Sequence, residues 1–250
     1  INKGFKIPSS SGYDSYSVKN SGEIDNQGWE VNLNAYNFVK VGDFSMDFNF
    51  NISNNINTIK YMEPSVLEGL NPDFNYKNGT YLNRVQLNNS YGSIYGFRYK
   101  GVYQYDYNSK RNPDQVNHTG EPVARDANGN VIYDESGKPK QMVYHFGDAN
   151  QWKFRGGDAI YEDINNDGNI DELDIVYLGN SNPDFNGGVG LKFKYKRLSL
   201  NVFGNFRYGN KVVNTARLNM ESMRDSYNQC ASVNWRWRKE GDVTEMPRAL

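Results

Sequence analysis

The stretch Phe44-Ser-Met-Asp-Phe-Asn-Phe-Asn-Ile-Ser53 places an apolar side chain at every second position. Successive side chains of a β-strand point to opposite faces, so this alternation predicts a strand with one apolar and one polar face. The apolar face is made of Phe44, Met46, Phe48, Phe50 and Ile52, and the polar face of Ser45, Asp47, Asn49 and Asn51.

Two hairpins are predicted around such strands. Trp29–Ala35 alternates in the same way, and the Gly-containing turn Val39–Asp43 joins it to the strand beginning at Phe44. Further along the chain, Leu191–Tyr195 and Leu198–Tyr208 alternate on either side of the very short turn Lys196–Arg197. The second strand of this pair has the length expected of a tilted membrane-spanning strand.

A third strand is predicted near the middle of the chain, because its aromatic side chains fall at odd positions. If the strand is unbroken at Gly101, they share one face, which either packs across strands, forms an interfacial girdle or stacks against sugars. These residues are Tyr91, Tyr95, Phe97, Tyr99, Tyr103, Tyr105 and Tyr107.

Long polar segments at about 60–90, 108–185 and 209–250 separate these strands. Short turns alternating with long loops are typical of outer-membrane β-barrels, in which the long loops are extracellular. The fold class predicted is therefore all-β, an antiparallel transmembrane β-barrel segment. A soluble β-sandwich shows the same alternation but needs a richer core than 37% hydrophobic residues give.

Composition limits the partners. The net charge of -1 and the pI near 6.2 provide no broad basic surface, so we expect no nucleic-acid partner. The single Cys230 excludes an internal disulfide. His118 and His145 lie in neither a metal-ligand spacing nor a nucleophile motif, and no phosphate-binding motif occurs, so no enzymatic function is predicted.

The loop beginning at Asp163 fits the template of a calcium-binding loop, D-x-[DN]-x-[DN]-G, with an acidic residue at its twelfth place. Gly168 permits the sharp turn that lets oxygen ligands converge. The expected ligands are Asp163, Asn165, Asp167, the Asn169 carbonyl, Asp171 and Asp174. The flanks are short β-favouring runs, so the loop stands alone, and a metal-free turn is the alternative.

The order of several segments resembles the SusC/RagA-type TonB-dependent outer-membrane transporters. The first segment reads N-S-G-E-I-D-N-Q-G-W-E, and the second reads G-S-I-Y-G-F-R-Y-K-G-V-Y-Q. The segments that carry the resemblance are Asn20–Glu30, Gly92–Gln104, Gly157–Asp163, Leu178–Phe185 and Asn234–Ala249.

This resemblance implies that residues 1–250 form an internal piece, from the C-terminal half, of a longer multi-pass barrel in a Gram-negative outer membrane. The whole barrel would have about 22 strands around a plug. The implied function is TonB-dependent import of glycans or peptides, with the TonB complex engaged by parts outside this chain. A SusD-like surface lipoprotein is the implied partner, and its expected contacts are Trp235, Arg236, Trp237 and Arg238.

An alternative function is a secreted, calcium-stabilised β-sandwich that binds carbohydrate through the aromatic stripe. Fractionation discriminates between the two. A barrel stays with the membrane fraction until detergent extracts it, whereas such a module is soluble without detergent. The sequence carries no recognisable code for the identity of a substrate.

Overall fold

The computed structural model describes residues 2–6, 16–64, 66–67, 82–83, 85–146, 150–223 and 228–249. The chain divides into two compact units, each built from two stretches of sequence. Unit 1 comprises Ile1–Tyr95 and Tyr177–Val212, and unit 2 comprises Gly96–Val176 and Val213–Leu250.

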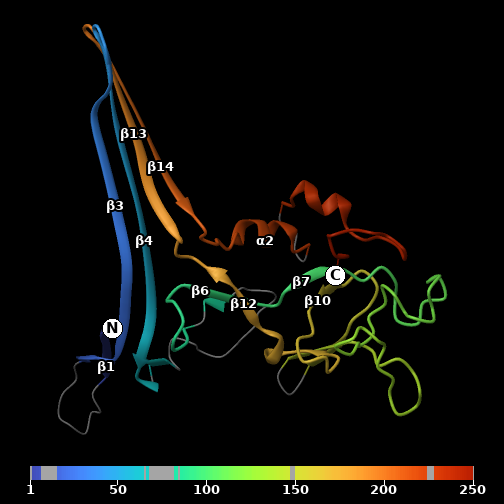
Figure 1. The fold of residues 1–250 in the computed structure, drawn as a ribbon. Coiled ribbons are helices and arrows are strands. Elements are labelled where there is room, and N and C mark those ends of the chain that lie inside the picture. Colours follow the sequence, from blue (N-terminus) through green and yellow to red (C-terminus); the bar gives the residue numbers. More distant parts are fainter. Residues whose placement is uncertain are drawn as a thin grey trace. The chain divides into compact units, whose positions relative to one another are not determined.

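Unit 1 is dominated by a four-stranded antiparallel sheet of order β14-β13-β4-β3 (Figure 1). Its strands are β3 (Gly22–Val41), β4 (Phe44–Met62), β13 (Phe185–Tyr195) and β14 (Leu198–Tyr208). Both predicted hairpins are present, and the pairing of β4 with β13 joins them. The antiparallel all-β class is confirmed, although β3 and β4 reach 20 and 19 residues, beyond the predicted segments.

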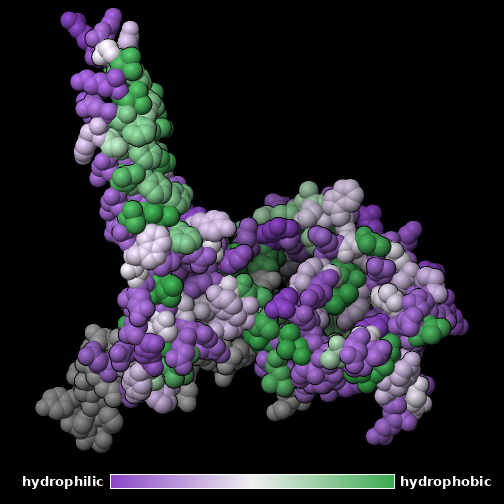
Figure 2. Space-filling model, in the orientation of Figure 1, coloured by the Kyte–Doolittle hydropathy of each residue, from purple (hydrophilic) through white to green (hydrophobic). Residues whose placement is uncertain are grey.

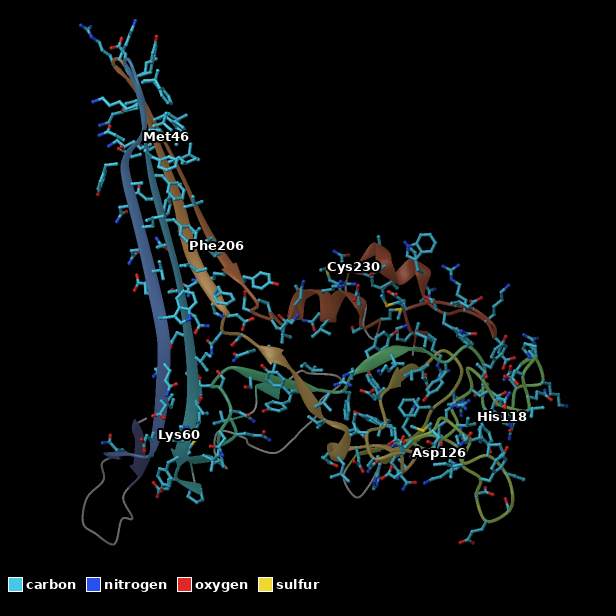
Figure 3. The ribbon with its side chains drawn as sticks, viewed as in Figure 1. Met46, Lys60, His118, Asp126, Phe206 and Cys230 are labelled. Atoms are coloured by element: carbon cyan, nitrogen blue, oxygen red, sulfur yellow. The ribbon has the colours of Figure 1, made fainter. Side chains whose placement is uncertain are left out.

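The register gives this sheet two chemically different faces. Phe48 lies opposite Ala35 on one side and Leu191 on the other, whereas the adjacent Asn49 lies opposite Asn34 and Gly190. Green side chains follow the long sheet in Figure 2, and the labelled Met46 and Phe206 in Figure 3 belong to this apolar face. The alternation predicted from the sequence is therefore confirmed across all four strands.

The apolar face of the sheet is not a buried core. Large side chains on it remain open, with 52% of Leu33, 59% of Leu200 and 51% of Val202 exposed. Contiguous exposed apolar surface of this kind marks a protein or membrane contact. Among the described residues the strands do not close a barrel, as predicted for a segment.

A local irregularity in β3 preserves the two faces. The register shifts between Ala35 and Val39, and Asn37 adopts a left-handed φ of 51°, which Asn tolerates better than most residues. The Asn37 backbone N–H donates to Asp47 Oδ1 at 2.9 Å. Between these two pairs, the three residues 36–38 of β3 lie opposite the single Asp47 of β4. Because two extra residues are inserted, the parity of the strand is retained and Val39 returns to the apolar face.

The rest of unit 1 consists of shorter elements. β1 (Asn2–Lys6) pairs with β2 (Tyr16–Asn20), and a second small sheet has the order β12-β6-β5. Its strands are β12 (Val176–Asn180), β6 (Ser93–Gly96) and β5 (Leu82–Asn83). A small core of Ile59, Met62, Val66 and Val85 lies where β4 ends.

Unit 2 consists mainly of turns tied together by short strands. Its core contains Tyr103, Ala124, Met142, Phe154 and Ile170. The elements are β7 (Tyr99–Val102), β8 (Val143–Phe146), β9 (Asn150–Lys153), β10 (Ala159–Tyr161), β11 (Asn169–Ile170), the 3-10 helices Glu172–Asp174 and Ala231–Trp235, and α2 (Thr215–Glu221). Within the described part of the chain, no helix is long and apolar enough to cross a membrane.

The prediction of one aromatic strand through Tyr91–Tyr107 is wrong. The segment holds only the short strands β6 and β7, and the boundary between the units falls between Tyr95 and Gly96. Tyr95 and Tyr103 are buried, at 6% and 5% exposed, because each packs inside its own unit. Gly101 has a φ of 132°, so the backbone departs from regular strand geometry there, and a single exposed stripe does not form.

The three predicted long loops contain more structure than their polar composition indicated. The segment 108–185 holds β8 to β12 and most of the unit 2 core, and the segment 209–250 holds α2. Their extracellular location stays a prediction.

The two faces of β4 predict opposite accessibility in the membrane. Single cysteines introduced into the full-length protein, on a Cys230→Ser background, should react with a water-soluble thiol reagent only on the polar face. Labelling is expected at Ser45, Asp47, Asn49 and Asn51, and protection at Phe44, Met46, Phe48, Phe50 and Ile52. The reverse pattern, or equal labelling of both sets, would contradict the lipid-facing assignment.

Candidate functional site

The loop Asp163–Asp174 is folded around the carboxylate of its first residue. Asp163 Oδ1 accepts the Asp167 N–H at 3.2 Å, and its Oδ2 accepts the Gly168 N–H at 2.8 Å. Asn166 and Gly168 have left-handed φ values of 58° and 82°, which turn the chain back toward Asp163. Gly168 thus has the role that the motif predicted for it.

The last residue of the loop closes it. Asp174 is 0% exposed, and its two oxygens accept the Ile164 N–H at 2.7 Å and the Asp171 N–H at 2.9 Å. Asp171 in turn caps the 3-10 helix Glu172–Asp174 by accepting the Leu173 N–H at 2.8 Å. The two ends of the motif are therefore joined through backbone groups, which hold its oxygens in a compact loop.

Contacts outside the motif fix the loop to unit 2. Ile170 is fully buried in the core, and β11 pairs in parallel with β8, with Asn169 opposite Val143. The Lys140 ammonium donates to the Asp167 carbonyl, and the Val143 N–H donates to the Gly168 carbonyl at 3.1 Å. None of these anchors was evident from the spacing of the motif.

The electrostatics of the loop favour a bound cation. Burial raises the pKa of Asp163, and the neighbouring Asp167 charge adds to this, while backbone donors act in the opposite direction. Burial likewise raises the pKa of Asp174, with further contributions from Asp163 and Asp171. A cation among these carboxylates would relieve both the desolvation and the mutual repulsion.

The donor set fits calcium, which prefers carboxylate, amide and carbonyl oxygens. The ligands are not gathered into a complete shell, however. Over the described ranges, no three acidic, histidine or cysteine side chains lie close enough together to hold one ion. Asn165 and Asp167 instead bond to each other, with Asn165 Nδ2 donating to Asp167 Oδ2 at 2.9 Å. Calcium binding by this loop is therefore kept as a proposal.

We expect calcium to order this loop in a pH-dependent way. The raised pKa values of Asp163 and Asp174 mean that the metal-free folded loop binds protons more tightly than the unfolded loop. That stability is present below the ordinary aspartate pKa and is lost as the pH rises through the raised values. Calcium requires ionised carboxylates, so its protection of the loop against protease should increase over the same pH range.

A pair of double variants tests the assignment. Asp163→Ala with Asp167→Ala should remove about one calcium per chain and abolish protection of the loop by calcium. Asp126→Ala with Asp134→Ala is the control, because these carboxylates also accept backbone N–H groups in turns of unit 2. Unchanged calcium content in the first variant would identify the loop as a metal-free turn.

The four residues predicted to bind a partner have different environments. Trp237 is partly buried against other parts of unit 2: its Nε1 donates to the Gln104 carbonyl at 3.2 Å, and a Cβ on Gly157 would lie 2.4 Å from its ring. Arg236 and Arg238 donate to nearby carbonyls of their own segment. Trp235 is 77% exposed and Arg238 is also exposed, so these two members of the set are accessible on the surface of unit 2.

Sequence reasoning missed a polar centre at Asp158. This carboxylate is 8% exposed and accepts Arg248 Nε at 2.7 Å and the Arg155 N–H at 2.8 Å. The Tyr103 N–H donates to the Asp158 carbonyl at 3.0 Å. Asp158 therefore holds the end of the chain against β7 and β10, and only the G-D pair at 157–158 marked it in the sequence.

His118 lies in a turn and pairs with a buried acid. Glu121 is 3% exposed and accepts from His118 Nδ1 at 2.8 Å and from Asn112 Nδ2 at 2.8 Å. Glu121 Oε2 also accepts the Asn108 N–H at 3.1 Å. These contacts close the turn in which His118 lies (Figure 3), whereas the other histidine, His145, lies in strand β8.

An open antiparallel sheet with one exposed apolar face and one polar face is the construction of a β-barrel wall. Three relatives from Formosa agariphila match nearly the whole chain and are named TonB-dependent receptors. TonB-dependent receptor P39 is 30% identical over 96% of this chain, and TonB-dependent receptors P3 and P26 are each 25% identical over 97%. No family model matches.

The chain is thus similar to TonB-dependent receptors from end to end. It covers 22% of the length of receptor P39 and 20% of receptors P3 and P26, so it spans about a fifth of these curated relatives.

Proposed function

We propose that this chain is a wall segment of a SusC/RagA-type TonB-dependent transporter that imports glycans or peptides across a Gram-negative outer membrane. The observation that carries the proposal is the exposed apolar face of the β14-β13-β4-β3 sheet. Its opposite, polar face suits the interior of a barrel, and the similarity to TonB-dependent receptors supports the same class. The transport step itself, energised through TonB, depends on parts of the protein outside this chain.

Lipid explains the apolar face better than a second sheet does. A β-sandwich buries the apolar faces of its sheets against one another, yet Val31 and Leu200 remain 50% and 59% exposed. The secreted β-sandwich module is therefore not favoured. Over the described residues, the sheet's apolar side chains find no covering layer of protein.

Arginine scanning at adjacent positions of β4 tests the import function. In the full-length transporter, Phe48→Arg should cost about 2–4 kcal/mol if it lies near the bilayer midplane. Membrane insertion and uptake of a glycan or peptide nutrient should then fall together. Asn49→Arg, on the polar face, should leave insertion intact.

Uptake by the unmodified protein should also stop when the proton gradient is dissipated. Equal insertion of the Phe48→Arg and Asn49→Arg variants, or recovery of the full-length protein without detergent, would contradict a lipid-facing sheet.

The partner proposed for unit 2 is a SusD-like lipoprotein that contacts the exposed Trp235. Trp is enriched among residues that dominate interface energies, and 77% of this side chain is open to solvent. A structural role for calcium is consistent with this surface, because an ordered loop 163–174 stiffens the same unit.

Trp235→Ala should weaken retention of the lipoprotein during co-purification by about tenfold or more, since interface hot spots contribute about 2 kcal/mol or more. Tyr133→Ala removes another exposed aromatic side chain of unit 2 and serves as the control. Shortening the tip of the 209–250 segment should have the same effect as Trp235→Ala. Undiminished co-purification in both variants would exclude docking through this segment.

A further inference from the structure

The pairing of β4 with β13 joins two hairpins that no turn connects. Within each hairpin, the register is set by the turn, which lies between β3 and β4 in one and between β13 and β14 in the other. A slip of one residue between β4 and β13 would move an apolar row to the polar face. A slip of two residues would leave every row on its own face. The alternation therefore excludes odd slips and leaves even slips open.

Strand β13 by itself opposes an even slip only weakly. Gly187, Gly188 and Gly190 lie in its paired part, and glycine-rich strands specify their register poorly. Gly187 does favour the observed register, because a Cβ there would lie 2.2 Å from the Asn51 carbonyl oxygen. The other two glycines present no side chain whose misplacement would oppose a slip. A further determinant of the register is therefore expected outside the sheet.

The edge of β4 that pairs with β13 has a different partner beyond Ser53. β13 pairs with β4 as far as Ser53, opposite Asn186. Further along β4, the Ile59 N–H donates to the Asn89 carbonyl at 3.0 Å, and the Asn88 N–H donates to the Ile59 carbonyl at 2.7 Å. Since β3 occupies the other edge of β4, the segment at 88–89 continues the edge that β13 leaves.

Polar side chains join these two partners of β4. Asn57 Oδ1, on β4, accepts the Ser90 hydroxyl at 2.8 Å and the Tyr91 N–H at 2.7 Å. Asn182 Nδ2, between β12 and β13, donates to the Tyr91 carbonyl at 2.6 Å. Both backbone groups of Tyr91 are thus held, one by β4 and one by the segment that leads into β13. We call this group the asparagine clasp, and its members are Asn57, Ser90, Tyr91, Gly92, Asn180, Ser181 and Asn182.

Gly92 permits the close approach of the two segments. Its carbonyl accepts the Ser181 N–H at 3.0 Å and the Ser181 hydroxyl at 3.1 Å. Gly92 has a φ of 106°, and a Cβ there would lie 2.6 Å from Ser181 Oγ. The Asn182 N–H donates to Asn180 Oδ1 at 2.9 Å, which holds the segment in a turn. The clasp therefore fits this glycine and this turn together.

The clasp is connected to β13 by a short stretch of chain. Asn54 Nδ2, on β4, donates to the Asp184 carbonyl at 2.7 Å, and the Asp184 N–H donates to the Tyr208 carbonyl at 2.9 Å. β13 begins at the next residue, Phe185. A slip of two residues would displace β13 along β4 by about 7 Å, more than a hydrogen bond spans. The contacts of the clasp and of Asp184 are therefore compatible with one register.

We propose that the asparagine clasp is a register lock for the β4–β13 pairing. Among the registers that keep the apolar rows aligned, it selects the one in which Asn186 lies opposite Ser53. Alternation excludes the odd slips, and the clasp excludes the even ones. The lock concerns how the two hairpins join, so it is independent of what the protein transports.

Disulfides between β4 and β13 report the register in the full-length protein carrying Cys230→Ser. A Cβ on Gly190 would lie 3.7 Å from Asn49 Cβ, within the range of about 3.5–4.5 Å found in disulfides. Asn49→Cys with Gly190→Cys therefore reports the observed register. Cross-linked peptides are quantified by mass spectrometry after mild oxidation. Slips of two residues in either direction are reported by Asn51→Cys with Gly190→Cys and by Ser45→Cys with Lys192→Cys.

With the clasp intact, the observed pair should form and the slipped pairs should stay at background. Asn182→Asp removes the donor and places a carboxylate against the Tyr91 carbonyl. The slipped pairs should then rise by about tenfold or more, because a lost hydrogen bond that leaves an acceptor unsatisfied changes a population by about this factor. Asn57→Ala should have the same effect.

Asn57→Asp is the matched control. A carboxylate at this position still accepts the Ser90 hydroxyl and the Tyr91 N–H, so the observed register should be retained. Two substitutions of one residue are thus expected to give opposite results, which a general loss of stability at the site does not explain.

Ser181→Ala is a milder variant, because it removes the hydroxyl bond to Gly92 and keeps the backbone bond. It should give a smaller rise of the slipped pairs, and it replaces Asn182→Asp if that variant yields no folded protein. Slipped pairs at background in Asn57→Ala and in the second variant would overturn the register lock. An equal rise in Asn57→Asp, or slipped pairs with the clasp intact, would overturn it as well.

Discussion

The two-faced pleat of the β14-β13-β4-β3 sheet is the constraint on which unit 1 depends. A slip of one residue in any pairing would move the whole apolar row of that strand to the polar face. The apolar row of each strand begins next to its hairpin turn, at Val41 in β3, Phe44 in β4, Tyr195 in β13 and Leu198 in β14. These four residues lie opposite one another, so the apolar rows specify the register against a slip of one residue. Even the irregularity at Asn37 obeys this constraint, since it inserts an even number of residues and returns Val39 to the row that Ala35 left.

Local periodicity explains which parts of the fold were predictable. Each hairpin is encoded by alternation and a short turn, so both were predicted from neighbouring residues. The pairing of β4 with β13 joins positions more than a hundred residues apart, and nothing local encodes it. The Tyr91–Tyr107 segment failed for the same reason: whether Tyr95 or Tyr99 is buried depends on the unit each packs in, which alternation does not reveal.

The candidate loop was predictable in its residues but not in its setting. The D-x-[DN]-x-[DN]-G spacing identified Asp163 and Gly168, whose roles in the turn are clear in the structure. The burial of Ile170 and the Lys140 contact come from segments that the spacing does not include. The Trp235–Arg238 run shows the opposite limit. Composition grouped four residues, but the fold leaves Trp237 partly buried and Trp235 exposed.

Unit 2 gives a physical reason for the loop to hold an ion. The core cluster of this unit is formed by Tyr103, Ala124, Met142, Phe154 and Ile170, and an ion bound only by the folded loop would add to the stability that this core provides. The same unit buries Asp174 and holds Asp163 beside it, which costs free energy while the carboxylates face only one another and backbone N–H groups. On the calcium proposal, the ion converts that cost into a link between the loop and the core through Ile170. The exposed Trp235 would then be presented from a unit in which charge neutralisation at the loop adds to the apolar burial of the core.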